Sequence, residues 1–348
     1  MLKIFVSVNS KMNTSNSSIK AGDGFFPSVV YWSLKSIISL VAVIGNGIVM
    51  WLICTRKRLH CTANWYVLSL ATADFCTGLI ITPSELTCLW KLAMCIWPLT
   101  LRVSFYNYPI SVSICCLFAL TLDRYLCVLY PLKYTRCMTS KLVIGLITSS
   151  WILPGILNFV CLFWMDSSIS IQKNADKVVT IMQIFLVSFL PSFFLVYAYT
   201  RILFTAVRHR RRSTERISQL RFNTKEGDSE HCVMSQRGRE RSSTVKVLGI
   251  VITFFVLCWI PSLYRATCGY FLQCTVSASV VQISRLLILL NSGMNFAVYA
   301  FLKKDIRKEL CKTCRKERNR SREHFRLMGR LSRASNNDLN RSSVKASR

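Results

Sequence analysis

The residues of this chain that could carry out covalent chemistry are few, and they do not form a catalytic pattern. The sequence has neither a His-Glu-x-x-His metalloprotease motif nor a pair of aspartates inside its apolar stretches. Its four histidines all lie in polar segments, at His60, His209, His231 and His324. The residue types and their spacing therefore argue against an enzyme.

Two acidic residues instead stand where a charge is costly. Asp74 lies within a long apolar run, where a carboxylate costs several kcal/mol unless it is hydrated, paired or bound to a cation. Asp123 precedes Arg124 at the end of another run, so its carboxylate can neutralise the guanidinium locally. Asp74 could bind an ion or only position helices. Arg124 could act in a switch or only anchor a helix at the membrane edge.

The elements that must position these residues are apolar spans. The chain has 348 residues, of which 52% are hydrophobic and 18% charged, with a mean hydropathy of +0.36, which is too apolar for a soluble enzyme. Seven stretches are long enough to cross a bilayer, and only helices satisfy their backbone there. Glycine and prolines within them predict kinks. The stretches are residues 28–54, 64–90, 103–128, 142–164, 178–207, 245–270 and 278–302.

The net charge of +29 gives the orientation of the spans. Of the 45 Lys and Arg residues, 35 lie in alternate loops and after residue 302, which places these segments in the cytoplasm and the N-terminus outside. Glycosylation sequons at Asn13 and Asn16 agree with this topology. We expect a multi-pass plasma-membrane protein without a nucleic-acid partner. Its parts are an extracellular segment (1–27), a seven-span domain (28–302), an amphipathic helix (303–314) and a basic cytoplasmic tail (315–348).

The spans also contain short motifs in a fixed order. These are Gly45-Asn46, Leu70-Ala71-Thr72-Ala73-Asp74, Asp123-Arg124-Tyr125, Pro191 with Tyr199, Phe255 to Pro261 and Asn291 to Tyr299. Together they resemble the motifs of rhodopsin-like (class A) G-protein-coupled receptors, over about residues 28–314. The resemblance implies an all-α membrane protein, a seven-transmembrane helix bundle with a short amphipathic eighth helix. Such a receptor binds an extracellular ligand and activates heterotrimeric G proteins, with arrestin and a receptor kinase as further partners.

The resemblance also implies two groups of functional residues inside the bundle. An activation switch and its core relay would consist of Asp123, Arg124, Tyr125, Ile114, Pro191, Tyr199, Phe255, Trp259, Pro261, Asn295 and Tyr299. An allosteric sodium ion would be held by Asp74, Ser113, Asn291, Ser292 and Asn295, with Asn46 nearby, and a hydrated carboxylate is the alternative. No other cofactor is expected. The acid that many relatives have at the base of helix six is replaced by Arg241, which predicts raised basal activity.

Three departures from the family pattern carry further expectations. Phe296 replaces the proline of helix seven and retains a backbone donor, so the kink there should be smaller. Leu99 replaces the cysteine that normally anchors the second outer loop, and residues 165–177 contain no cysteine. Two other pairings are open, Cys268 with Cys274 or Cys88 with Cys95. Cys311 and Cys314 are placed for palmitoylation.

The outer half of the bundle has an unusual set of polar residues. Tyr106 stands where amine receptors have an aspartate, and Leu289 stands where opsins have the retinal-binding lysine. We therefore expect neither a typical amine nor retinal. The ligand-binding residues implied are Glu85, Arg102, Tyr106, Asn107, Gln183, Tyr264, Arg265 and Arg285. Three arginines favour an anionic small molecule, an acidic lipid or a peptide, although they could also extend to lipid headgroups while Glu85 meets an amine.

Two other functions remain open at the sequence level. An ion-coupled transporter could use Asp74 as its relay, and would move ions without a G protein. A decoy receptor would bind its ligand and couple to no G protein.

Overall fold

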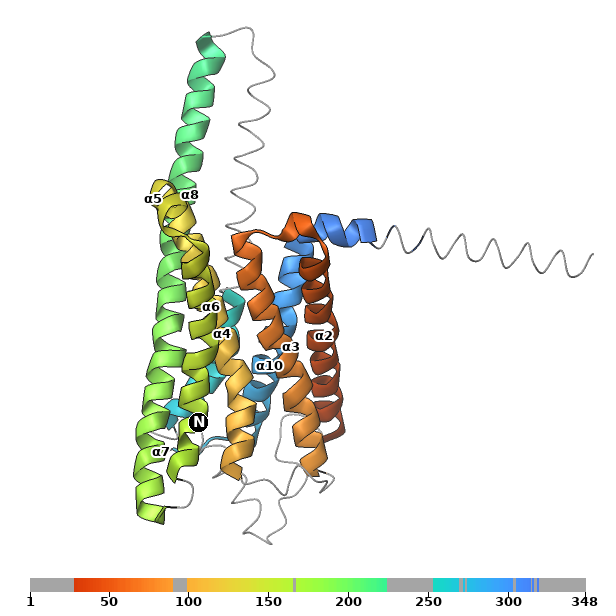
Figure 1. The fold of residues 1–348 in the computed structure, drawn as a ribbon, viewed down its shortest axis with the longest axis vertical. Coiled ribbons are helices and arrows are strands. Elements are labelled where there is room, and N and C mark those ends of the chain that lie inside the picture. The colour runs from red at the N-terminus through yellow and green to blue at the C-terminus, as the bar shows by residue number, and fades with distance from the viewer. Residues whose placement is uncertain are drawn as a thin grey trace, which may run out of the picture. The chain divides into compact units, whose positions relative to one another are not determined.

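The structure, a computed structural model, describes residues 28–89, 99–164, 167–223, 253–268, 274–302 and 305–313, together with positions 272, 315 and 318. All regular elements of these residues are helical, which confirms the predicted all-α class (Figure 1). The transmembrane part comprises α2 (Ser28–Thr55), α3 (Thr62–Leu89), α4 (Leu99–Leu129), α6 (Ser140–Phe159), α7 (Ile169–Gln183), α8 (Leu190–Asn223), a helix at 253–267 and α10 (Ala278–Leu302). Short elements are η1 (Lys57–Leu59), α5 (Pro131–Cys137), η3 (Val160–Trp164) and the π-helical η4 (Ile184–Phe189).

Six of the helical stretches are long and apolar enough to cross a membrane. They match six of the seven spans expected from the sequence, and the helix at 253–267 is the described part of the remaining one. A helix at 305–313 occupies the part of the sequence where the amphipathic helix was expected. The described elements are therefore those of a seven-helix membrane bundle.

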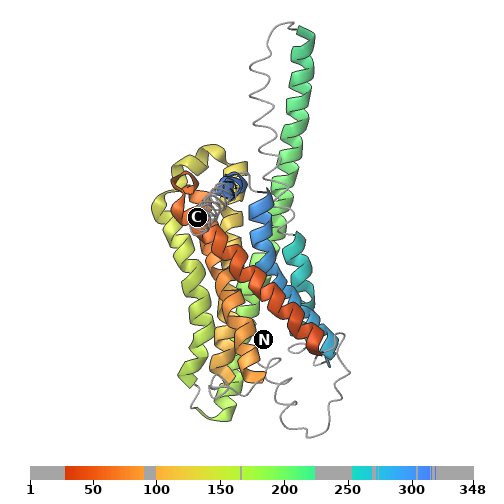
Figure 2. The ribbon, with the colours of Figure 1, turned by 90° about the vertical axis from the view of Figure 1, so that its right-hand side faces the viewer.

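The helix α4 lies at the centre of the packing. It contacts α3, α6 and α8, while α2 packs against both α3 and α10 (Figure 2). Almost every residue of α4 from 103 to 121 is buried, whereas α6 exposes large apolar side chains such as Ile144, Ile152 and Ile156. Exposed apolar side chains are normal where lipid is the solvent. Side chains of α4 thus face the interior along most of its length.

The fifth span is longer than expected and begins earlier. Residues 165–177 were expected to be an outer loop, but α7 begins at Ile169 and continues through η4 into α8. The amphipathic sequence of α7 allows a helix to continue beyond the apolar region. The indole Nε1 of Trp164 donates to Asp176 Oδ1 at 2.9 Å, which links the end of η3 to α7. The π-helical turn precedes Pro191, which cannot donate a hydrogen bond to the carbonyl of residue 187.

Small residues allow α2 to approach its neighbours closely. A Cβ atom at Gly45 would lie 2.3 Å from Cδ1 of Phe296, so this glycine makes the space that the ring occupies. A Cβ atom at Gly78 would lie 2.9 Å from the Ser39 carbonyl oxygen, and the Ser39 hydroxyl donates to the Gly78 carbonyl. Because Phe296 keeps its backbone donor, α10 runs as a continuous α-helix. The replacement of the helix-seven proline is therefore accommodated by the opposing glycine.

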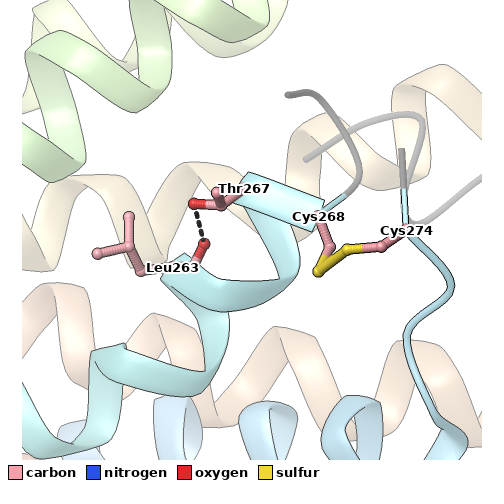
Figure 3. Close-up of a disulfide and its surroundings, with 4 residues drawn as sticks. All are labelled: Leu263, Thr267, Cys268 and Cys274. Carbon is pink, nitrogen blue, oxygen red and sulfur yellow. Dashed lines mark hydrogen bonds between the residues drawn. A yellow bond between two sulfur atoms is a disulfide. The ribbon is translucent and has the colours of Figure 1, made fainter. Parts of the chain in front are cut away.

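A disulfide joins Cys268 to Cys274 at the end of the 253–267 helix (Figure 3). The backbone N–H of Cys274 also donates to the Cys268 carbonyl at 3.1 Å, which closes a tight loop. This is one of the two pairings that the sequence left open. The other includes Cys95, which lies outside the described residues, as do Asn13, Asn16, Arg241 and Cys314.

Replacing Gly45 by Ala is expected to destabilise the protein by about 1–3 kcal/mol, because the new methyl group would overlap the Phe296 ring. The melting temperature of the purified protein should fall by several degrees, and adding Phe296→Ala should restore part of the loss. Gly145→Ala is the matched control, because no atom lies within 4 Å of a Cβ there. Equal melting temperatures for the two glycine variants would contradict this packing.

Candidate ligand site and conformational switch

Asp74 is the centre of a fully buried polar cluster that joins three helices. Ser113 Oγ of α4 donates to Asp74 Oδ1 at 2.7 Å, and Asn295 Nδ2 of α10 donates to Oδ2 at 2.8 Å. Ser292 adds a further side-chain hydrogen bond. Hydrogen bonds from three side chains allow a carboxylate to remain in an apolar medium. The sequence predicted these partners, and the structure brings them together.

Asn46 extends the cluster towards α2. Its Nδ2 donates to the carbonyls of Ala42 at 2.9 Å and Ser292 at 3.1 Å, while its buried Oδ1 has no hydrogen-bond partner in the described part of the chain. Asn291, also predicted for this cluster, is buried on α10. The cluster thus offers several neutral oxygens and one carboxylate, the donor set that suits a hard cation.

At the inner end of α4, Asp123 is held by two partners. The Nε of Arg124 lies 3.5 Å from Asp123 Oδ2, and the Tyr134 hydroxyl of α5 donates to Oδ1 at 2.8 Å. Asp123 is fully buried, and Arg124 is partly exposed. Burial, together with the hydrogen bond to Asp123, raises the pKa of Tyr134 well above its usual value, so the phenol stays protonated and donates. The expected pair is therefore formed and is fixed by a residue that sequence reasoning missed.

The predicted core relay lies midway along the bundle. Phe255 and Trp259 are buried with ring centroids 5.8 Å apart, and Ile114 is buried as well. A small cavity adjoins Trp259, and the space open to the centre of a water molecule is about 10 Å³, close to what one water needs. The aromatic relay is therefore packed with little free space. Its lining includes Asn107, Ile110, Ser111, Ile114, Gln183 and Val187.

The remaining predicted switch residues make fewer contacts with one another among the described residues. Tyr125 contacts the rings of Phe194 and Tyr197, with centroid distances of 6.0 and 6.1 Å. Tyr199 is half-buried on α8, Pro191 is buried, and Pro261 is partly buried. The Tyr299 side chain lies outside the described residues, so its expected link to Arg124 is not placed.

The outer end of the bundle contains a cluster of charges from several helices. Lys35 of α2 is fully buried and forms an ion pair with Glu85 of α3. Tyr106 of α4 lies within electrostatic range of Glu85, Arg265 and Arg285, and Tyr31 of α2 lies in range of the same three residues. Arg265 Nη1 donates to Ser284 Oγ on α10 at 2.6 Å. We call these residues the outer cluster: Tyr31, Lys35, Glu85, Tyr106, Arg265, Ser284 and Arg285.

Four of the predicted ligand residues belong to the outer cluster, and the others lie elsewhere. Arg102 is one helical turn from Tyr106 on α4. Asn107 and Gln183 line the cavity beside Trp259, where Gln183 Nε2 donates to Asn158 Oδ1 at 2.7 Å. Tyr264 was expected in the pocket, but it is 51% exposed. Its neighbour Arg265 takes the inward face of the helix, so Tyr264 is turned away by about 100°.

Sequence reasoning missed Lys35, although a signal for it was present. It is the one charged residue within the first apolar span, and an isolated charge in such a span marks a functional or paired site. Its partner Glu85 is 50 residues away, so the pair becomes visible only when α2 packs on α3.

The comparison with known proteins agrees with this order of helices and motifs. The sequence model of the family described as "7 transmembrane receptor (rhodopsin family)" matches residues 45–299. The chain belongs to this family. It is therefore a rhodopsin-like G-protein-coupled receptor and a multi-pass membrane protein, which confirms the resemblance inferred from the motifs. The family is one of receptors.

Its relatives are distant. The receptor is 26% identical over 321 residues to the 5-hydroxytryptamine receptor 4 of Cavia porcellus, covering 84% of this chain and 81% of the relative. It is 27% identical over 311 residues to the trace amine-associated receptor 8c of Mus musculus, covering 83% and 87%. An octopamine receptor beta-2R of Chilo suppressalis is 23% identical over 331 residues, covering 84% and 82%. These relatives support the receptor class but do not fix the ligand.

Replacing Tyr134 by Phe is expected to destabilise the receptor by about 1.5–3 kcal/mol, because the buried Asp123 carboxylate loses a charge-assisted hydrogen bond. The melting temperature should fall by several degrees relative to Tyr130→Phe, a matched variant at an exposed tyrosine. In an Asp123→Asn background the effect of Tyr134→Phe should shrink, which a double-mutant cycle measures. An unchanged effect in that background would show that the hydroxyl acts through another group.

Proposed function

We propose that this receptor binds an extracellular ligand and activates heterotrimeric G proteins through the Asp123–Arg124 pair. The observation that carries the proposal is the buried Asp123 carboxylate, which binds Arg124 and is held by Tyr134 from α5. In this arrangement the guanidinium charge is neutralised inside the receptor. Release of Arg124 would present a cation at the cytoplasmic end of α4, where a G protein can reach it.

The contacts of α4 inside the bundle support the proposal that ligand binding at the outer end affects this pair. α4 carries Tyr106 in the outer cluster, Ile114 beside Trp259, Ser113 on Asp74 and then Asp123. A change in the position of α4 relative to its neighbours would alter all of these contacts together. Ligand binding would shift the equilibrium between two arrangements of such contacts.

The test is G-protein activation in cells that express wild-type receptor or Arg124→Ala. The wild type should give a basal or ligand-dependent signal. At equal surface expression, the signal of the variant should be at least tenfold lower. Arg136→Ala, at an exposed arginine of α5, is the matched control and should signal normally. Full activity of Arg124→Ala would remove this residue from the switch. Failure of the wild type to activate any G-protein class would favour a decoy receptor, or a transporter if ion current appears.

We further propose that the ligand is not a typical amine. The acid that would bind an ammonium group on α4 is replaced by Tyr106. Glu85 is already paired with Lys35, whose positive charge opposes the approach of a second cation such as an amine. An amine remains the second candidate, because the relatives named above are receptors for 5-hydroxytryptamine, trace amines and octopamine.

We propose a plasma-membrane location with the N-terminus outside, because most Lys and Arg residues lie in segments assigned to the cytoplasm. Arrestin and a receptor kinase are proposed as further partners from family membership. Cys311 is exposed on the 305–313 helix, which leaves its thiol open to palmitoylation.

We also propose that Asp74 and its neighbours bind a sodium ion. Sodium should raise the melting temperature of the wild type. At a sodium concentration ten times the dissociation constant, the free energy of unfolding should increase by about 1.4 kcal/mol. Asp74→Asn should abolish this increase, because the amide removes the negative charge while keeping the shape. N-methylglucamine chloride at the same ionic strength is the control. A sodium effect that persists in Asp74→Asn would place the ion elsewhere.

A further inference from the structure

The ammonium group of Lys35 lies among groups of the kind that bind ammonium ions. Its Nζ forms an ion pair with the Glu85 carboxylate, and the Lys35 side chain is fully buried. The same Nζ lies 5.7 Å from the ring centroid of Tyr31 and 5.4 Å from that of Trp32. A carboxylate, together with aromatic rings within about 6 Å, is what proteins use to bind free amines. In this receptor a side chain of the protein itself occupies such a site.

The helical spacing on α2 explains how this helix builds its part of the site. Tyr31 and Trp32 precede Lys35 by about one turn, and long side chains of a helix point back towards its N-terminus. The Lys35 side chain therefore runs along α2 towards the two rings. Tyr31, Lys35 and Ser39 recur at every fourth residue and are buried, whereas Leu34 is exposed. The buried face is the one that contacts α3.

Close packing of α2 on α3 places Glu85 at the level of this lysine. One turn inward from Lys35, the Ser39 hydroxyl donates to the Gly78 carbonyl. A Cβ atom at Gly78 would lie 2.9 Å from the Ser39 carbonyl oxygen, so the two backbones approach closely here. Glu85 follows Gly78 by about two helical turns on α3. Its carboxylate therefore lies within reach of the Lys35 ammonium group.

Glu85 keeps the capacity to bind an ammonium ion from outside the protein. Its buried Oε1 has no hydrogen-bond partner in the part of the chain that the structure describes. Its side chain is 15% exposed, whereas that of Lys35 is fully buried, so solvent reaches the pair from the carboxylate side. While Lys35 is present, a second ammonium ion would meet a charge of its own sign. Without the lysine, a carboxylate, two rings and the space of an alkyl chain would remain.

We propose that Lys35 acts as a built-in ammonium ligand of Glu85, Tyr31 and Trp32, and thereby excludes free amines from this site. This inference rests on the proposed function, because it makes Lys35 a determinant of specificity in a receptor whose ligand is not a typical amine. It also assigns a ligand class to the site that opens when the lysine is removed, namely primary alkylammonium ions.

Chemical rescue tests this proposal. Lys35→Ala removes Cγ, Cδ, Cε and Nζ, and n-propylammonium supplies the same atoms. The melting temperature of Lys35→Ala should fall by several degrees, because Glu85 loses its buried partner. Saturating n-propylammonium should raise the melting temperature of this variant by about 2–4 °C and leave the wild type unchanged. The uncharged analogue 1-propanol should not raise it.

The measurements use the full-length receptor in phosphatidylcholine nanodiscs, with potassium chloride exchanged for n-propylammonium chloride at constant ionic strength. The double variant Lys35→Ala/Glu85→Gln is the matched control for the carboxylate and should not respond, because the amide lacks the charge that attracts the amine. Lys177→Ala, at an exposed lysine of α7, should behave like the wild type. If Lys35→Ala does not fold, its surface expression in cells grown with n-propylammonium is measured instead. Expression should rise several-fold, and that of the double variant should not.

Equal stabilisation of the wild type and Lys35→Ala by the amine would overturn the proposal. So would a response to 1-propanol as large as that to the amine, a response that persists in the Glu85→Gln background, or no response of Lys35→Ala in either measurement. Melting and surface expression require no G protein. Rescue by the amine in a receptor that activates no G protein would therefore contradict the proposed function and leave the ammonium site standing. Absence of rescue in a receptor that signals would do the reverse.

Discussion

The structure depends on one constraint, which is that a polar group in the membrane must find its partner inside the protein. For the backbone this requirement is met by helices. For side chains it is met at three levels of the bundle, by the Lys35–Glu85 pair, the Asp74 cluster and the Asp123 pair with Tyr134. Each of these joins different helices or segments. The polar side chains whose burial costs free energy are thus the ones that link the helices to one another.

The central helix α4 connects these levels. It contributes Tyr106 near the outer end, Ser113 and Ile114 in the middle and Asp123 at the inner end. Because α4 is buried over most of its length, small shifts of it disturb packing on several neighbours. Gly45 and Gly78 hold α2 close to α10 and α3, which brings Lys35 within reach of Glu85. The polar contacts therefore rely on the apolar packing around them.

Family membership and ligand chemistry are separate properties of this receptor. The family model matches residues 45–299, which include both the Asp74 and Asp123 sites and the residue Tyr106 that replaces the amine-binding acid. One fold can carry sites for ligands of different chemistry, so family membership alone does not fix the ligand. The relatives named for amines are identical to this chain at about a quarter of the aligned residues. They therefore share its fold but need not share Tyr106 and its surroundings.

Hydropathy and short motifs were enough to predict the helical spans apart from the early start of the fifth, the segregation of basic residues, and most residues of the Asp74 and Asp123 sites. The sequence also left Cys268 with Cys274 as one of two open pairings. Which distant side chains meet depends on how the helices pack. The Lys35–Glu85 pair, the bond from Tyr134 to Asp123 and the outward position of Tyr264 depend on helix rotation and packing. Contacts across 11 to 50 residues have no local signal, so only the assembled bundle reveals them.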